Sequence, residues 1–206
     1  MATEIQFYYD DGTALVSFDD NDCIETTLTD SGDAVDGWVA ETYRLHRRGH
    51  VAGLDVEWRP ARAQRPPGPV AVLQLCVDHR CLVFQILRAD YVPEALSNFL
   101  ADRRFTFVGV GISDDAAKLR ARYGLRVTSA VDLRSLAADS LGRPELRRAG
   151  LRALVWEVMG VQMEKPRHVS LSAWDAPVLS DDQLKYACAD AFASFEVGRR
   201  LYAGEY

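Results

Sequence analysis

Short apolar or alternating runs fill most of the first half of the chain and predict strands, whereas longer runs with a helical period dominate the second half. An opening hairpin is predicted because the turn signal Asp10-Asp11-Gly12-Thr13 separates two β-rich runs. The predicted strands cover residues 5–9, 14–18, 23–28, 51–58, 70–77, 81–86, 106–110 and 127–133. The predicted helices cover residues 33–48, 93–100, 113–123, 134–141, 151–159 and 181–202. We expect Asp33 to cap the first helix, Ser113 or Asp114 to cap the third, and Gly124 to end the third.

The order of these elements predicts the fold class. The strands over residues 51–58, 70–77 and 81–86 follow one another and form one sheet, after which helices and strands alternate. We therefore expect an α/β protein with a mixed central sheet of about five strands, flanked by helices and completed by a long C-terminal helix. With 206 residues and 48% hydrophobic content, residues 1–206 should fold as a single domain, with residues 1–50 as scaffold or interaction surface.

Composition narrows the classes of function. The N-terminus lacks the basic and apolar regions of a secretory signal, and no segment approaches the roughly 20 apolar residues of a membrane span. We expect a soluble, intracellular protein in the nucleus, the cytoplasm or both, with no membrane partner. Four cysteines without CxxC spacing disfavour zinc and dithiol chemistry and are expected to be reduced and buried: Cys23, Cys76, Cys81 and Cys188.

Charge is unevenly distributed along the chain. The net charge of −6 argues against a broad basic surface that holds duplex DNA. Residues 118–167 nevertheless contain eleven Lys or Arg against five Asp or Glu, and they lie between acidic flanks. This basic segment is either an ordinary solvated helix surface or a local patch that follows phosphates.

Two acidic side chains interrupt an otherwise apolar strand. Asp55 and Glu57 are two residues apart, so both project from the same face of the sheet. A lone Asp-x-Glu pair is more often structural than catalytic. In a central buried strand, however, an unpaired acidic couple is costly, and a divalent cation between the carboxylates would remove that cost.

Two further motifs place acids in predicted helices. Asp115 follows Val108-Gly109-Val110-Gly111-Ile112 in the first turn of a helix, where capping and the helix dipole are the ordinary explanation for an acid. Tyr186 and Asp190 lie four residues apart, so the phenol and the carboxylate address one point, although a core tyrosine with a chance acid is the ordinary case. Each motif alone is weak, and their combination carries the signal.

Taken in order, Asp55-x-Glu57, Asp115 and Tyr186-x-x-x-Asp190 resemble the three exonuclease motifs of the DEDDy family, which includes ribonuclease D and the exonuclease domain of the Werner syndrome protein. The resemblance runs from about residue 51 to residue 202, the motif-bearing core, and is similar in particular to plant Werner-like exonucleases. Further agreement comes from Leu73-Gln74-Leu75, Ser172-x-Trp174 and the segment from Leu179 to Ala187.

This resemblance implies a ribonuclease H-like exonuclease fold and a 3′→5′ exonuclease that releases nucleoside 5′-monophosphates by a two-metal mechanism. The implied ligands of two Mg²⁺ or Mn²⁺ ions are Asp55, Glu57, Asp115 and Asp190. Tyr186 would orient the attacking water. The sister subfamily has a histidine at the position of Lys185, so His168 is not the general base by motif.

The implied partner is nucleic acid with a free 3′ end, DNA and/or RNA, single-stranded or recessed. Lys165, Arg167 and Trp174 are candidate substrate contacts, and the basic segment gains weight as a guiding surface, particularly Arg143, Arg147 and Arg148. Small stand-alone relatives can form rings, so homo-oligomerisation is a further expectation. Two alternatives stay open: a catalytically weak nucleic-acid-binding or interaction module on the same fold, and a metal-dependent phosphatase or nucleotide hydrolase.

Overall fold

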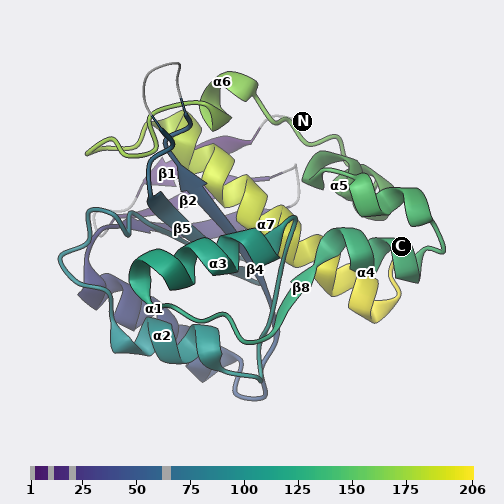
Figure 1. The fold of residues 1–206 in the computed structure, drawn as a ribbon, viewed down its shortest axis with the longest axis horizontal. Coiled ribbons are helices and arrows are strands. Elements are labelled where there is room, and N and C mark those ends of the chain that lie inside the picture. Colours follow the sequence, from purple (N-terminus) through teal and green to yellow (C-terminus); the bar gives the residue numbers. More distant parts are fainter. Residues whose placement is uncertain (1–2, 9–11, 19–21, 62–65) are drawn as a thin grey trace.

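A computed structural model describes residues 3–8, 12–18, 22–61 and 66–206 of the protein, which form an eight-stranded mixed sheet with helices on both faces (Figure 1). The strands are β1 Glu4–Tyr8, β2 Thr13–Ser17, β3 Cys23–Thr29, β4 Val51–Trp58, β5 Val70–Val77, β6 Arg80–Phe84, β7 Thr106–Gly109 and β8 Ala130–Asp132. The helices are α1 Gly32–Leu45, α2 Glu94–Ala101, α3 Ile112–Tyr123, α4 Leu133–Ser140, α5 Leu151–Met159, α6 Arg167–Ser170 and α7 Asp181–Ala203, with a 3₁₀ helix, η1, at Pro144–Arg148. No helix in the described part of the chain is long and apolar enough to cross a membrane.

The sheet is wider than predicted, with eight strands in the order β1-β2-β3-β6-β5-β4-β7-β8 in place of about five. The difference arises because β3 pairs in parallel with β6, which joins the N-terminal β1–β2–β3 meander to the central strands. Such a pairing between distant segments leaves no local sequence signal. The α/β class is confirmed. Asp10 and Asp11 of the predicted turn lie outside the described residues.

Apolar residues alternate along β4 with small and acidic residues, so the two faces of the strand differ. Ala52, Leu54 and Val56 belong to the core that includes side chains of α1, α2 and α3. The intervening positions, from Gly53 to Glu57, face the opposite side, where α7 crosses the sheet (Figure 1). The strand therefore turns a purely apolar face to one layer of helices and a small and acidic face to α7.

Gly53 allows α7 to lie directly against β4. A methyl group at this position would come within 2.0 Å of the Ala191 carbonyl oxygen and 2.7 Å of the Phe195 amide nitrogen, both backbone atoms of α7. Backbone atoms of a buried helix cannot move aside as the end of a flexible side chain can. The absence of a side chain at Gly53 therefore sets the distance between the strand and the helix that carry the acidic motifs.

Several helix boundaries differ from the predictions. Ser31, two residues before Asp33, caps α1, and its hydroxyl accepts a hydrogen bond from the Ala34 amide. Gly111, with φ +78°, precedes α3 in place of a cap by Ser113 or Asp114, whereas Gly124 ends α3 as predicted. The helices η1 and α6 were not predicted, since each is too short for a helical period to appear.

The expectation of four buried, reduced cysteines is wrong for three of them. Cys76 and Cys81 lie opposite each other across the β5–β6 hairpin and form a disulfide, with Cα atoms 4.2 Å apart. Because the two cysteines are five residues apart, the hairpin turn brings them opposite each other on neighbouring strands. The absence of a CxxC motif therefore did not exclude this disulfide. Cys23 is exposed, and Cys188 is free and buried.

Replacing Gly53 by alanine should destabilise the fold by about 1–3 kcal/mol or more, because the new methyl group meets the backbone of α7. Gly37→Ala is the matched control: Gly37 is exposed in α1 with open space around its Cα, so alanine should stabilise by about 0.5–1 kcal/mol. Urea unfolding of both variants measures the effect. Equal stabilities of Gly53→Ala and the wild type would contradict the close approach.

Candidate active site

Three predicted carboxylates converge at one point beside the sheet. Asp55 and Glu57 come from β4, and Asp190 comes from α7, one turn after Tyr186. One carboxylate oxygen from each lies within 4.8 Å of those from the other two. The close packing of Gly53 against α7 therefore brings residues 135 positions apart into a single acidic cluster.

Asp115 lies next to this cluster, in the first turn of α3, which follows β7, the parallel neighbour of β4. Its side chain is buried, and the Lys118 ammonium lies 3.2 Å from its Oδ1. Burial raises the pKa of Asp115 to about 7, with a further contribution from the charge of Asp55. The structure thus gathers all four predicted carboxylates, three of them in close contact and the fourth adjacent to Asp55.

The cluster is electrostatically costly without a compensating charge. Burial and the charges of Asp55 and Asp190 raise the pKa of Glu57 from 4.5 to about 9. Burial also raises the pKa of Asp190 to about 7 and raises that of Asp55. Carboxylates that hold their protons near neutral pH are poised to release them to a cation.

Lys165 supplies positive charge to the cluster, from the segment between α5 and α6. Its Nζ lies 2.7 Å from Oδ2 of Asp190 and 5.3 Å from the centre of the Tyr186 ring. Burial alone lowers the pKa of Lys165, but the charges of Asp190 and Asp55 outweigh it, so the net shift is upward and the ammonium stays charged. Lys165, which was predicted as a substrate contact, pairs with Asp190 of the acidic cluster and also lines the cavity beside it.

The residues of the cluster fit a divalent cation. Oδ1 of Asp190 is buried and has no hydrogen-bond partner among the described residues. Buried polar atoms are normally satisfied, so an orphaned carboxylate oxygen that faces other carboxylates indicates a missing charge. Donors that are all oxygen atoms suit Mg²⁺ or Mn²⁺ better than softer metals.

Tyr186 is held in place by Trp174. The two rings lie 5.8 Å apart, and the indole N–H of Trp174 donates to the Ser170 carbonyl oxygen at 3.3 Å. Burial and the charge of Asp190 raise the pKa of Tyr186, so the phenol keeps its proton and can donate a hydrogen bond. Trp174 itself is 1% exposed and therefore offers no surface to a substrate, in contrast to the prediction.

Gln74 is a candidate residue that the sequence analysis did not assign to the site. It lies directly opposite Asp55 in the β4–β5 register, and opposite residues share a face of the sheet. Its side chain is fully buried, and neither amide atom has a hydrogen-bond partner in the described part of the chain. The signal was present, because Gln74 is the one polar residue in the otherwise apolar strand of residues 70–77.

A cavity of about 450 Å³ opens beside the cluster and is lined by Asp55, Tyr186, Lys165, Arg167, Arg152 and five other residues. Arg152 and Arg167 form no ion pair within residues 3–8, 12–18, 22–61 and 66–206. The sequence analysis did not single out Arg152, since nothing in its neighbourhood shows that it faces the acidic cluster.

Two arginines of the predicted guiding surface are already neutralised. Arg143 pairs with Glu145 and Glu157, and Arg147 pairs with Asp139 at 2.5 Å. Only part of the charge of the basic segment is therefore available for phosphates. His168 is exposed and lines a separate pocket of about 230 Å³ that also reaches Tyr186.

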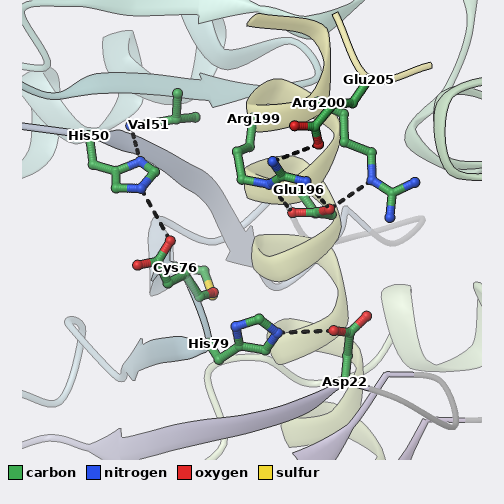
Figure 2. A network of polar contacts seen from close by, with 10 residues as sticks. Asp22, His50, Val51, Cys76, His79, Glu196, Arg199, Arg200 and Glu205 are labelled. Carbon is green, nitrogen blue, oxygen red and sulfur yellow. Dashed lines mark hydrogen bonds and ion pairs between the residues drawn. The ribbon is translucent and has the colours of Figure 1, made fainter. Parts of the chain in front are cut away.

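A second group of metal-ligand types, His46, His50 and Asp78, lies near the opposite end of β4. Each histidine Nε2 is 3.2–3.3 Å from a carboxylate oxygen of Asp78. The Val51 amide donates to Nδ1 of His50 (Figure 2), so the proton of the neutral ring is on Nε2. This Nε2 lies 3.2 Å from Oδ1 of Asp78. These contacts have a structural explanation, because they hold the end of α1 and the start of β4 against the β5–β6 turn.

Comparison with known proteins gives the family of the chain. The sequence profile of the 3′-5′ exonuclease family matches residues 36–202. The chain belongs to this family. A 3′-5′ exonuclease of Arabidopsis thaliana is 36% identical over 79% of this chain and 56% of its own length. The bifunctional 3′-5′ exonuclease/ATP-dependent helicase WRN of Mus musculus is 33% identical over 74% of this chain and 11% of its own. The chain thus spans about half or less of these relatives.

Solved structures of the exonuclease family share the fold. Escherichia coli RNase D, an exoribonuclease involved in structured RNA processing, matches with a TM-score of 0.71 and 24% identity, over 86% of this chain and 44% of that one. The EXD2 exonuclease domain soaked in Mn matches with a TM-score of 0.52 and 27% identity, over 87% and 89% of the two chains. The ribonuclease H-like exonuclease fold is confirmed.

Without metal, stability should fall as pH rises, because the folded state holds a proton on Glu57 that the unfolded state has lost. Between about pH 7 and about pH 8.5 in EDTA, the free energy of unfolding should drop by roughly 1–2 kcal/mol. Glu57→Gln should flatten this slope, whereas Glu41→Gln on the exposed surface of α1 should not. Urea unfolding across this range measures the slopes, and parallel lines for wild type and Glu57→Gln would contradict the raised pKa of Glu57.

Removing the charge of Lys165 should weaken the metal-free protein and strengthen metal binding. Lys165→Met leaves the carboxylates without their ion-pair partner, so stability in EDTA should fall by at least about 1 kcal/mol. Mn²⁺ affinity by calorimetry should rise, since the ammonium no longer competes for Asp190. Lys185→Met, which breaks a surface pair with Asp182, is the control. Weaker Mn²⁺ binding by Lys165→Met would show that the ammonium does not compete with the ion.

Proposed function

We propose that this protein is a divalent-metal-dependent 3′→5′ exonuclease that releases nucleoside 5′-monophosphates from nucleic acid. The observation that carries the proposal is the convergence of Asp55, Glu57 and Asp190 oxygens within 4.8 Å, with Asp115 beside them. Membership of the 3′-5′ exonuclease family supports it. A cavity lined by Asp55 and Tyr186 would give a phosphodiester access to the edge of the cluster.

Each site residue has a role that follows from its place. Asp55, Glu57 and Asp190 would hold one Mg²⁺ or Mn²⁺ ion, and Asp55 and Asp115 a second. Bound there, the ions supply Lewis acidity that lowers the pKa of the attacking water and neutralises charge on the phosphate. Tyr186 orients that water through its O–H, and Trp174 fixes the ring. Arg152 and Arg167 bind phosphate oxygens in the same cavity.

Lys165 has two partners in this scheme. In the metal-free site its ammonium neutralises Asp190. With cations on the carboxylates, the same charge would be repelled from them and would be free to contact a phosphate oxygen of the substrate, since Lys165 also lines the cavity. The substrate contact predicted for Lys165 would then belong to the metal-bound state.

The substrate class in the proposal is DNA and/or RNA with a free 3′ end, and the place of action is inside the cell, in the nucleus, the cytoplasm or both. A 2′-hydroxyl separates the two nucleic acids chemically, and the described residues give no pocket that selects for it. The proposal includes assembly of the protein into a homo-oligomer.

A time course with 5′-labelled single-stranded RNA and DNA oligomers in Mg²⁺ or Mn²⁺ tests the function. We expect a ladder that shortens from the 3′ end, no phosphate release from mononucleotides, and loss of activity by at least about 10³-fold in Asp55→Ala/Glu57→Ala. Glu94→Gln, at an exposed acid in the first turn of α2, is the matched control. Tyr186→Phe should lower kcat by about 10²-fold with little change in KM.

Two outcomes would redirect the proposal. Binding without metal-dependent shortening by the folded wild type would favour a nucleic-acid-binding module on this fold. Hydrolysis of mononucleotides in place of oligomers would favour a nucleotide phosphatase. A ladder that persists in the double variant would show that the carboxylate cluster is not the catalytic centre.

A further inference from the structure

Two adjoining cavities connect the acidic cluster with the surface of α5. The cavity beside Asp55 and Tyr186 includes Gly150 and Arg152 in its wall. A second cavity of about 420 Å³ shares Gly150 and Arg152 and adds Ala153, Trp156 and Gln162. The hollow surface therefore continues from the carboxylates, past Arg152, to Trp156.

Trp156 does not pack into the core, as a side chain of its size usually does. Its side chain is 53% exposed, whereas Leu154 and Val155 of the same helix are fully buried in the core. Arg152 and Trp156 are four residues apart, so they lie on one side of α5, about 6 Å apart along the helix axis. Isolated surface tryptophans are common, but this one borders the path that leads to the acidic cluster.

The charges around Trp156 favour a polyanion. Arg152 and Arg167 make no ion pair in the part of the chain that the structure describes. Glu157, the neighbour of Trp156, is neutralised by Arg143. The wall of the path therefore presents the guanidinium groups of Arg152 and Arg167, and Arg152 shares a cavity with the exposed indole. The acid next to Trp156 in the sequence is already paired.

We propose that Trp156 and Arg152 form a subsite for a nucleotide upstream of the 3′ end, and this subsite rests on the proposed exonuclease function. The indole stacks on an unpaired base, and Arg152 and Arg167 contact the phosphates that lead from it to the carboxylates. Aromatic stacking combined with backbone cations binds single strands with little sequence preference. Within a duplex both faces of a base are stacked on neighbouring base pairs and are closed to the indole, so the subsite selects single-stranded 3′ ends over fully paired ones.

Trp156→Ala tests the subsite by the dependence of its effect on substrate length. For a single-stranded octamer, kcat/KM should fall by about 5- to 100-fold through KM, which is the size of one stacking contact. The loss for a dinucleotide should be at least about 5-fold smaller, because that substrate is too short to occupy the subsite fully. Trp156→Phe should recover most of the octamer activity. Tyr202→Ala, which removes a similarly exposed aromatic at the end of α7, is the control and should match the wild type.

Binding measured without turnover separates this inference from the proposed function. With Ca²⁺ in place of Mg²⁺, the octamer should quench the tryptophan fluorescence of the wild type, and Trp156→Phe should lose the quenching. If the wild type shortens oligomers but Trp156→Ala has unchanged KM, the subsite is wrong and the exonuclease stands. If no protein shortens oligomers but Trp156→Ala still weakens binding about 5-fold or more, the exonuclease is wrong and the binding surface stands. An equal loss for dinucleotide and octamer would overturn the subsite, because it would show a structural effect.

Discussion

The direct contact between the backbones of β4 and α7 is the constraint on which the site depends. It exists because Gly53 has no side chain, and a single methyl group there would meet the Ala191 carbonyl oxygen. The contact fixes the positions of the site residues on both elements. The alternation of the strand places Asp55 and Glu57 on the face toward α7, and the helical repeat places Tyr186 and Asp190 on one side of α7. A strand and a buried helix are rigid supports, so the carboxylates are held close together before any ion arrives.

That rigidity has an electrostatic cost, which Lys165 reduces. Carboxylates fixed within 4.8 Å of one another repel, and their raised pKa values express this strain. The ammonium of Lys165, 2.7 Å from Asp190, supplies positive charge to the cluster in the absence of divalent cations. Lys165 therefore affects both the metal-free and the metal-bound protein, because the charge that stabilises the metal-free protein also opposes the binding of metal.

Features set by neighbouring residues could be predicted from the sequence, whereas contacts between distant segments could not. Asp55 and Glu57 could be placed on one face because a strand has a period of two, and Tyr186 and Asp190 could be placed together because a helix repeats at four residues. Lys165 could not be placed, since it reaches the cluster from an irregular segment with no period. Nor could Arg143 be recognised as paired with Glu157, or Arg147 with Asp139, because these acidic partners lie on neighbouring elements. The width of the sheet was missed for the same reason, as the β3–β6 pairing joins segments some fifty residues apart.

That pairing has a consequence for the order in which the protein is made. During synthesis the β1–β2–β3 meander leaves the ribosome well before β6 does, so β3 waits with one unpaired edge until the chain beyond Phe84 has emerged. An open strand edge is a template for pairing with other chains. The β3 edge of the nascent protein is therefore open to pairing with other chains until β6 has been made, and the β3–β6 pairing must close a long loop.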